Sequence, residues 1–182
     1  MLRAVLEFGR GPFEEMDERD IAEHLLSILR DVLPQRYFSL RLVDLRGHAS
    51  VRVYGDSERI RSDLSLSRLS IKGTALNKTN IKSAVAKSAF LRIDTRWDSP
   101  FSGVAAGFAV PVVHGGELLG VLDVGYPLGQ DASERDEELL LPLVNQLAMA
   151  LRSERMVRDT RALRDYQSRL IEHASALILG ID

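Results

Sequence analysis

Charged and aromatic side chains gather in the middle of the chain, in a stretch without a regular apolar pattern. Arg92, Asp94, Arg96 and Trp97 lie within six residues of one another, and Trp97 is the single tryptophan. Guanidinium groups bind carboxylates and phosphates through paired hydrogen bonds, and aromatic rings line many ligand pockets. The cluster therefore indicates a loop that binds an anionic group of a small molecule. The alternative is a loop in which Trp97 covers the core while the charges face water.

Asp123 is a carboxylate in the middle of an apolar run, residues 119–124. A buried carboxylate is costly unless a cation or hydrogen-bond donors compensate it. Asp123 therefore predicts a structural ion pair or the polar floor of a ligand pocket, and one residue can serve both purposes.

The residue types that most catalytic and metal sites need are scarce. The chain has no cysteine, which excludes disulfides, thiolate catalysis and cysteine-based zinc sites. Its four histidines form no pair at metal-ligand spacing with a third ligand nearby, and there is no glycine-rich phosphate loop or nucleophile elbow. We expect no catalytic residues, no metal and no enzymatic activity.

The composition is typical of a folded domain. The 182 residues are 45% hydrophobic and 27% charged, with a net charge of −2, and this length allows one sizeable core with a helical extension. The slightly acidic balance favours no nucleic acid partner, and no apolar run approaches the roughly 18 residues of a membrane span. We expect a cytoplasmic chain, or the soluble piece of a longer protein, without a membrane partner.

Residues 107–127 predict the centre of the fold. Two apolar runs flank Gly115 and Gly116, and a Gly-Gly pair suits a type I′ hairpin turn because both central residues need a positive φ. Nearly every position in these runs is apolar, which indicates two central antiparallel strands covered on both faces.

The other elements surround this hairpin. Helical spacing of apolar residues predicts a helix from Asp17 to Pro34, and residues 1–16 are expected to be poorly ordered because glycines and a proline interrupt them. Further strands are predicted at residues 37–44, 51–54, 64–71 and 90–93. Residues 73–100 are irregular, as is typical of a functional loop or a lid.

A long helix is predicted from about Glu134 towards Ala174, with Pro142 expected to kink it. An apolar residue recurs at every seventh position of this helix, namely Met149, Met156, Leu163, Leu170 and Leu177. This spacing is typical of one seam of a parallel coiled coil, so we expect a homodimer. The companion positions four residues later are polar or small, which makes the seam weak. The alternative is a single solvated helix.

The element order resembles the GAF domain family. The resemblance is carried by FAVPV at residues 108–112 and GELLGVL at residues 116–122, which look like the family's apolar strand with a central proline and its Gly-Val-Leu strand. Residues 170–182 resemble the opening of a PAS domain. We therefore expect a poorly ordered segment at residues 1–16 and a GAF-like sensory domain at 17–151. A signalling helix or linker at 152–182 would run into a truncated PAS-like domain.

The resemblance implies an α+β fold: a six-stranded antiparallel sheet with the N- and C-terminal helices on one face. Loops and short helices would cover a small-molecule pocket on the other face. In the family's strand order the first strand lies beside the strand of Asp123, which brings Arg41 within reach. The cofactor is unknown, and the lack of cysteine excludes a covalently attached bilin and the cysteine-dependent reduction of methionine sulfoxide.

Cyclic-nucleotide-binding members of the family carry an Asn-Lys … Phe-x-x-x-Asp-Glu signature. Asn77, Lys78, Phe90 and Asp94 match it, but Thr95 stands in place of the glutamate. A cyclic nucleotide is thus one candidate ligand, and the alternative is a solvated loop with one buried phenylalanine.

The sequence as a whole predicts a non-catalytic sensory module of a signal-transduction protein such as a histidine kinase. It would bind a small molecule and relay its state through the C-terminal helix. The alternative is a ligand-free dimerisation and spacer domain. The candidate ligand-binding residues are Arg41, Asn77, Lys78, Phe90, Arg92, Asp94, Arg96, Trp97 and Asp123.

Overall fold

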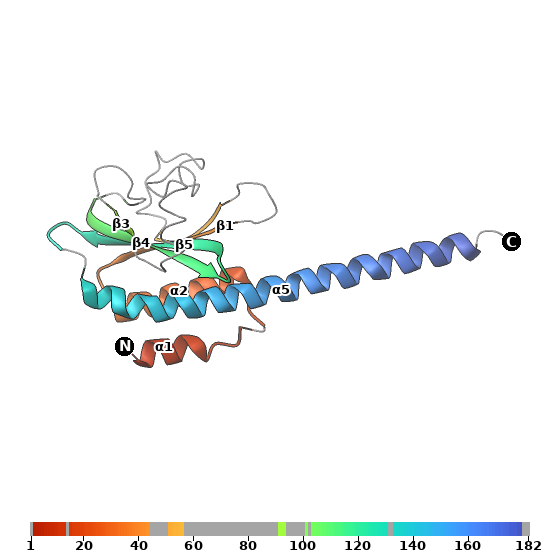
Figure 1. The fold of residues 1–182 in the computed structure, drawn as a ribbon, viewed down its shortest axis with the longest axis horizontal. Coiled ribbons are helices and arrows are strands. Elements are labelled where there is room, and N and C mark those ends of the chain that lie inside the picture. The colour runs from red at the N-terminus through yellow and green to blue at the C-terminus, as the bar shows by residue number, and fades with distance from the viewer. Residues whose placement is uncertain are drawn as a thin grey trace.

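The computed structural model describes residues 2–13, 15–43, 51–56, 91–93, 101, 103–130 and 133–179. Figure 1 shows three layers: the sheet, the helices α2 and α5 beneath it, and α1 on their outer side. The helices are α1 (Leu2–Gly9), α2 (Glu18–Val32) and α5 (Glu134–Leu179). The strands are β1 (Tyr37–Val43), β2 (Val51–Gly55), β3 (Leu91–Ile93), β4 (Val104–His114) and β5 (Glu117–Pro127).

The sheet has the strand order β2-β1-β5-β4-β3, and every pairing is antiparallel. The predicted hairpin is confirmed: β4 and β5 pair along their length, and Gly115 and Gly116 have φ of 57° and 79°. The antiparallel α+β fold is confirmed as well, with β3 as the expected short edge strand. The described residues supply five strands in place of the six expected, and the strand predicted at residues 64–71 lies outside them.

One face of the sheet packs on α2 and α5. Side chains alternate along a strand, so every second residue of β1 faces the helices. These residues form one core cluster with the inner faces of both helices, including Phe38, Leu40, Leu42, Phe108, Val110, Leu122, Val124, Leu25, Leu29, Leu140 and Leu147. Each such side chain contributes about 1.5–3 kcal/mol of burial free energy, so this cluster supplies most of what holds the layers together.

Helix α2 begins as its sequence predicts. Asp17 is the N-cap, and its Oδ1 accepts hydrogen bonds from the backbone N–H groups of Arg19 and Asp20 at 2.8 and 2.9 Å. The Asp20 side chain in turn accepts from the N–H of Asp17, which completes a capping box. The cap fixes where the chain enters the helix layer, immediately before Glu18.

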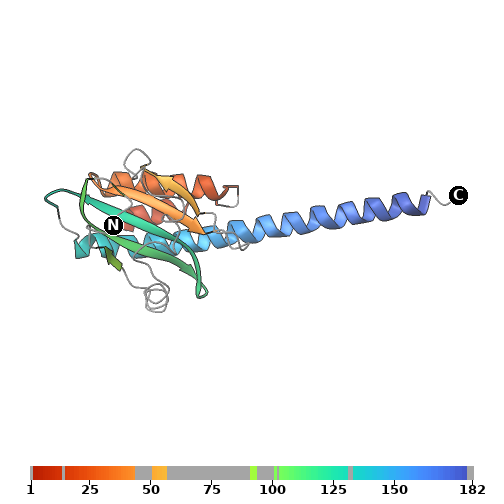
Figure 2. The same cartoon turned by 90° about the horizontal axis from the view of Figure 1, so that it is seen from above.

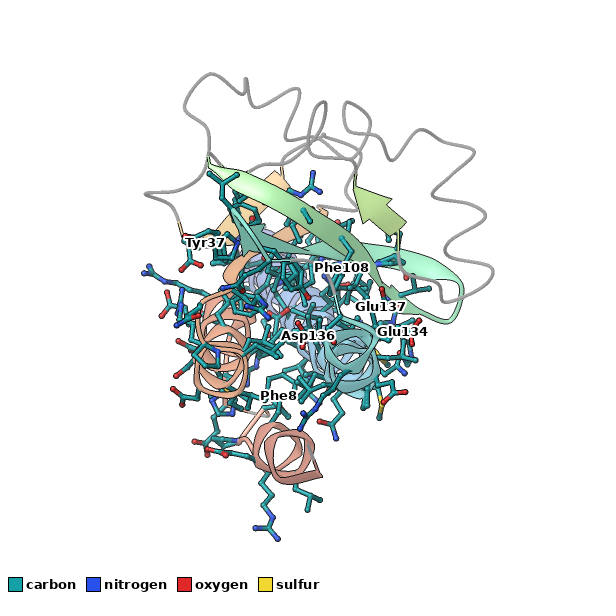
Figure 3. The ribbon with its side chains drawn as sticks, turned by 90° about the vertical axis from the view of Figure 1, so that its left-hand side faces the viewer. Phe8, Tyr37, Phe108, Glu134, Asp136 and Glu137 are labelled. Carbon is teal, nitrogen blue, oxygen red and sulfur yellow. The ribbon has the colours of Figure 1, made fainter. Side chains whose placement is uncertain are left out.

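The N-terminal segment differs from the expectation that residues 1–16 are poorly ordered. Leu2–Gly9 form α1, and Phe8 is fully buried between α1 and the layer of α2 and α5 (Figure 3). Its ring stacks on His24 of α2 with ring centroids 5.5 Å apart, and Phe13 lies 5.0 Å from it. The glycines that suggested disorder end this helix instead of preventing it.

Helix α5 is a single helix of 46 residues that passes through Pro142. Its first turn is fixed by Asp136, whose Oδ2 accepts a 2.7 Å hydrogen bond from the buried Tyr126 hydroxyl and lies 3.4 Å from Arg36 Nε. The Arg36 guanidinium also stacks over the Tyr126 ring at 4.5 Å. Figures 1 and 2 show the second half of α5 projecting far beyond the sheet.

Candidate functional site

The second face of the sheet, away from α2 and α5, carries a different set of side chains. In the strand register Ser39 pairs with Asp123, and Arg41 pairs with Val121. Ala109 of β4 also pairs with Asp123. All five residues are buried, yet none belongs to the core cluster beneath the sheet. We call this set the polar face.

Arg41 and Asp123 form a buried, two-pronged ion pair on the polar face. Arg41 Nε donates to Asp123 Oδ2 and Nη2 donates to Oδ1, both at 2.6 Å. Arg41 is 1% exposed and Asp123 is fully buried. Burial raises the pKa of the Asp123 carboxyl, and the adjacent guanidinium acts against that rise. The predicted pairing is confirmed, whereas a role in ligand binding stays a prediction.

Ser39 is a polar residue of this face that sequence reasoning missed. It is fully buried, and its Oγ has no hydrogen-bond partner in the structure. An unsatisfied buried hydroxyl costs about 1–3 kcal/mol. The only signal in the sequence is that Ser39 alternates with Arg41 along β1 and so shares its face. Ser39 pairs with Asp123 in the strand register, so its unpaired hydroxyl lies on the same face as the Asp123 carboxylate.

Aromatic rings lie at one end of the polar face. Tyr37 of β1 contacts the buried Phe101, with ring centroids 6.1 Å apart. Gly125 lies beneath Phe101, because a Cβ built on Gly125 would come 2.7 Å from its Cδ2. A charged pair, a free hydroxyl and aromatic rings are the groups that orient a small polar ligand in a mostly apolar site.

Of the other predicted site residues, Arg92 is the one whose backbone the structure describes. Arg92 pairs with Phe108 in the register of β3 and β4, whereas Leu91 pairs with Ala109, the partner of Asp123. The backbone position of Arg92 is therefore one step out of alternation with the polar face. Outside the described residues lie Asn77, Lys78, Phe90, Asp94, Arg96 and Trp97.

The described residues also bear on metal binding and membrane insertion. They contain no group of three or more histidine, aspartate or glutamate side chains arranged to hold a metal ion. Among the helices placed by the structure, none combines the length and apolarity needed to cross a bilayer.

Comparisons with known proteins agree on the fold. A family model described as GAF domain matches residues 15–152, while no curated protein matches the chain. The GAF domain from an Acinetobacter phosphoenolpyruvate-protein phosphotransferase is similar with a TM-score of 0.62 at 15% identity. That match covers 86% of this chain and 95% of the other.

Two further solved structures have a bound molecule in their names. The phycoerythrobilin-bound GAF domain from a cyanobacterial phytochrome has a TM-score of 0.60 at 15% identity, covering 86% of this chain and 97% of its own. The free methionine-R-sulfoxide reductase from Neisseria meningitidis, in complex with its substrate, has a TM-score of 0.55 at 19% identity, covering 85% and 89%. Such identities show the fold alone, but the family model spans most of the sequence. The chain therefore belongs to the GAF domain family.

Proposed function

We propose that this chain is a non-catalytic sensory or regulatory module of a cytoplasmic signal-transduction protein. It binds a small molecule over the polar face and relays its state through α5 to a downstream kinase or other regulator. The observation that carries the proposal is that α5 has a packed half and an exposed half. The helix is part of the domain core up to Leu151, while residues 159–173 are exposed without exception.

The exposed half of α5 supports dimerisation of the module. The stripe begins at Met149, an exposed position of the packed half, and leaves large apolar side chains in water. Their exposed fractions are 61% for Met149, 58% for Met156, 63% for Leu163 and 50% for Leu170. A parallel partner helix would bury these side chains against their copies. Thr160 and Gln167 would lie in the same seam as polar residues, which keeps the dimer weak and open to adjustment by a ligand.

Two of the compared structures support the proposal that this chain binds a small molecule. The compared phytochrome domain holds phycoerythrobilin and the compared reductase is in complex with its substrate, so this fold accommodates small molecules of different chemistry. Because the chain has no cysteine, the ligand we propose is held without a covalent bond to the protein. A cyclic nucleotide is one candidate, through the signature that Asn77 and Lys78 open.

Substitutions in the stripe test the relay helix directly. Replacing Met156 and Leu163 with Asp should give monomers in sedimentation experiments, because two charges would be buried in each chain of the seam. Replacing Thr160 and Gln167 with Leu should strengthen the dimer. The matched control changes Arg161 and Ser168, which lie outside the stripe in the same exposed part of the helix, to Asp, and it should leave the dimer unchanged. If all variants and the wild type are monomers with equal helix content, the stripe is not a dimer seam.

A ligand-free dimerisation and spacer domain is the second candidate function. It is favoured by the fact that Arg41 and Asp123 satisfy each other while fully buried. Native mass spectrometry of protein purified from its own host separates the two. We expect a stoichiometric small-molecule adduct that dissociates on denaturation. The bare chain mass, under conditions that preserve the dimer, would favour the spacer.

A further inference from the structure

The last buried contacts of helix α5 with the domain are made by charged side chains and not by apolar ones. Leu151 is the last fully buried apolar residue of α5, and Arg155, one turn later, is only 6% exposed. The next residues are intermediate or exposed, and none is buried from Met156 to His173. The turn around Arg155 is therefore the last point at which the domain can set the direction of the projecting helix.

Arg155 lies beside a carboxylate that also binds the sheet. Glu18, the first residue of α2, is 6% exposed, and its Oε2 lies 3.8 Å from Arg155 Nη2. Its Oε1 accepts from Arg52 Nη1 at 3.0 Å and from the Tyr54 hydroxyl at 3.5 Å. Glu18 thus joins α2, β2 and α5 through its two carboxylate oxygens.

Strand β2 connects this junction with the polar face. Arg52 and Tyr54 contact Glu18, and the residues that alternate with them, Val53 and Gly55, pair with Arg41 and Ser39 in the sheet register. Successive side chains of a strand point to opposite faces. A change at the polar face that moves β2 therefore moves the partners of Glu18 as well.

A second carboxylate, that of Glu154, lies near Arg155 in the same turn of α5. Glu154 has a largely buried side chain; its Oε1 lies 3.6 Å from Arg158 Nη1, while its Oε2 is buried without a hydrogen-bond partner. Burial raises the pKa of Glu154. Arg158 and Arg155 oppose the rise, and the charges of Glu18 and Asp17 add to it. Glu154 and Glu18 thus compete for Arg155.

We propose that Glu18, Arg52, Tyr54 and Arg155 form an electrostatic latch that fixes the exit of α5 and that the sheet can open, with Glu154 as the competing carboxylate. The latch deepens the relay in the proposed function. Opening it frees the turn around Arg155 while the helix up to Leu151 stays packed in the core. The second arrangement is one in which Arg155 turns from Glu18 to the unsatisfied oxygen of Glu154.

Amide hydrogen exchange of the full chain tests the latch. Glu18→Gln keeps the size of the side chain but removes its charge, so exchange in residues 152–160 should become about tenfold faster. Residues 139–150 should exchange as in the wild type. Glu23→Gln is the control in the same helix, because Glu23 pairs with Arg19 in an exposed position. Unchanged exchange in Glu18→Gln, or faster exchange throughout the domain, would overturn the proposal.

Glu154→Gln tests the latch by removing the charge that competes with Glu18. Because burial raises the pKa of Glu154, an ionised carboxylate at this position costs stability in the closed latch. The neutral amide should therefore slow exchange in residues 152–160 at pH 7, and the difference from wild type should vanish below the ordinary glutamate pKa of about 4.5. Equal exchange at pH 7 would contradict the latch. Both variants are measured again with Met156 and Leu163 changed to Asp, so that a failed latch is told apart from a failed dimer seam.

Discussion

Replacing Asp123 with alanine is expected to lower the free energy of unfolding by about 3–5 kcal/mol. The Arg41 guanidinium is 1% exposed, so it would stay buried after losing the carboxylate that it contacts through two nitrogens. Its two 2.6 Å hydrogen bonds to the carboxylate would be lost at the same time. Urea denaturation followed by circular dichroism gives the free energy of unfolding of the variant and the wild type.

Two controls separate the loss of the buried ion pair from the loss of side-chain volume. The double variant Arg41→Met, Asp123→Leu replaces the pair by apolar groups, and it should be much closer to wild type than the single variant. Glu23→Ala removes an ion pair that lies in water and should change stability little. If Asp123→Ala lowers the free energy of unfolding no more than Glu23→Ala does, the buried ion pair does not stabilise the protein more than an exposed one.

Replacing Phe8 with alanine is expected to destabilise the protein by about 3 kcal/mol, at the lower end for a buried phenylalanine. Phe8 is fully buried and stacks on His24. It lies in a peripheral helix that can partly adjust to the cavity. Leu6→Ala is the matched control, because Leu6 lies in the same helix and is 48% exposed. If the two variants denature at the same urea concentration, α1 does not contribute to the folded domain.

Short sequence patterns were enough to predict most of the fold. Gly115 and Gly116 marked the hairpin because a tight turn needs positive φ at adjacent positions, and both residues have it. Asp123 marked a buried pair because an apolar strand tolerates a carboxylate only with a partner. Arg41 could be named as that partner only through the strand order that a family resemblance supplied, since 82 residues separate the two in sequence.

The features that the sequence did not reveal depend on contacts between distant segments. Helix α1 has breakers at its end, as folded helices do, and only the packing of Phe8 against α2 and α5 shows that it is docked. Glu18 reads as a first-turn acid of α2, a common and sufficient role. Nothing in its neighbourhood signals that Arg155, more than a hundred residues away, meets it at the exit of α5.

Because α5 continues far beyond its last buried residue, a small change in its direction at the domain becomes a large movement at its far end. Residues 156–179 extend for about 36 Å at the ordinary rise of an α-helix. A tilt of about 10° at the turn around Arg155 would move the far end of α5 sideways by about 6 Å. A small change of helix direction at this turn thus becomes, at the far end of α5, a sideways displacement comparable with the roughly 8–10 Å between the axes of packed helices.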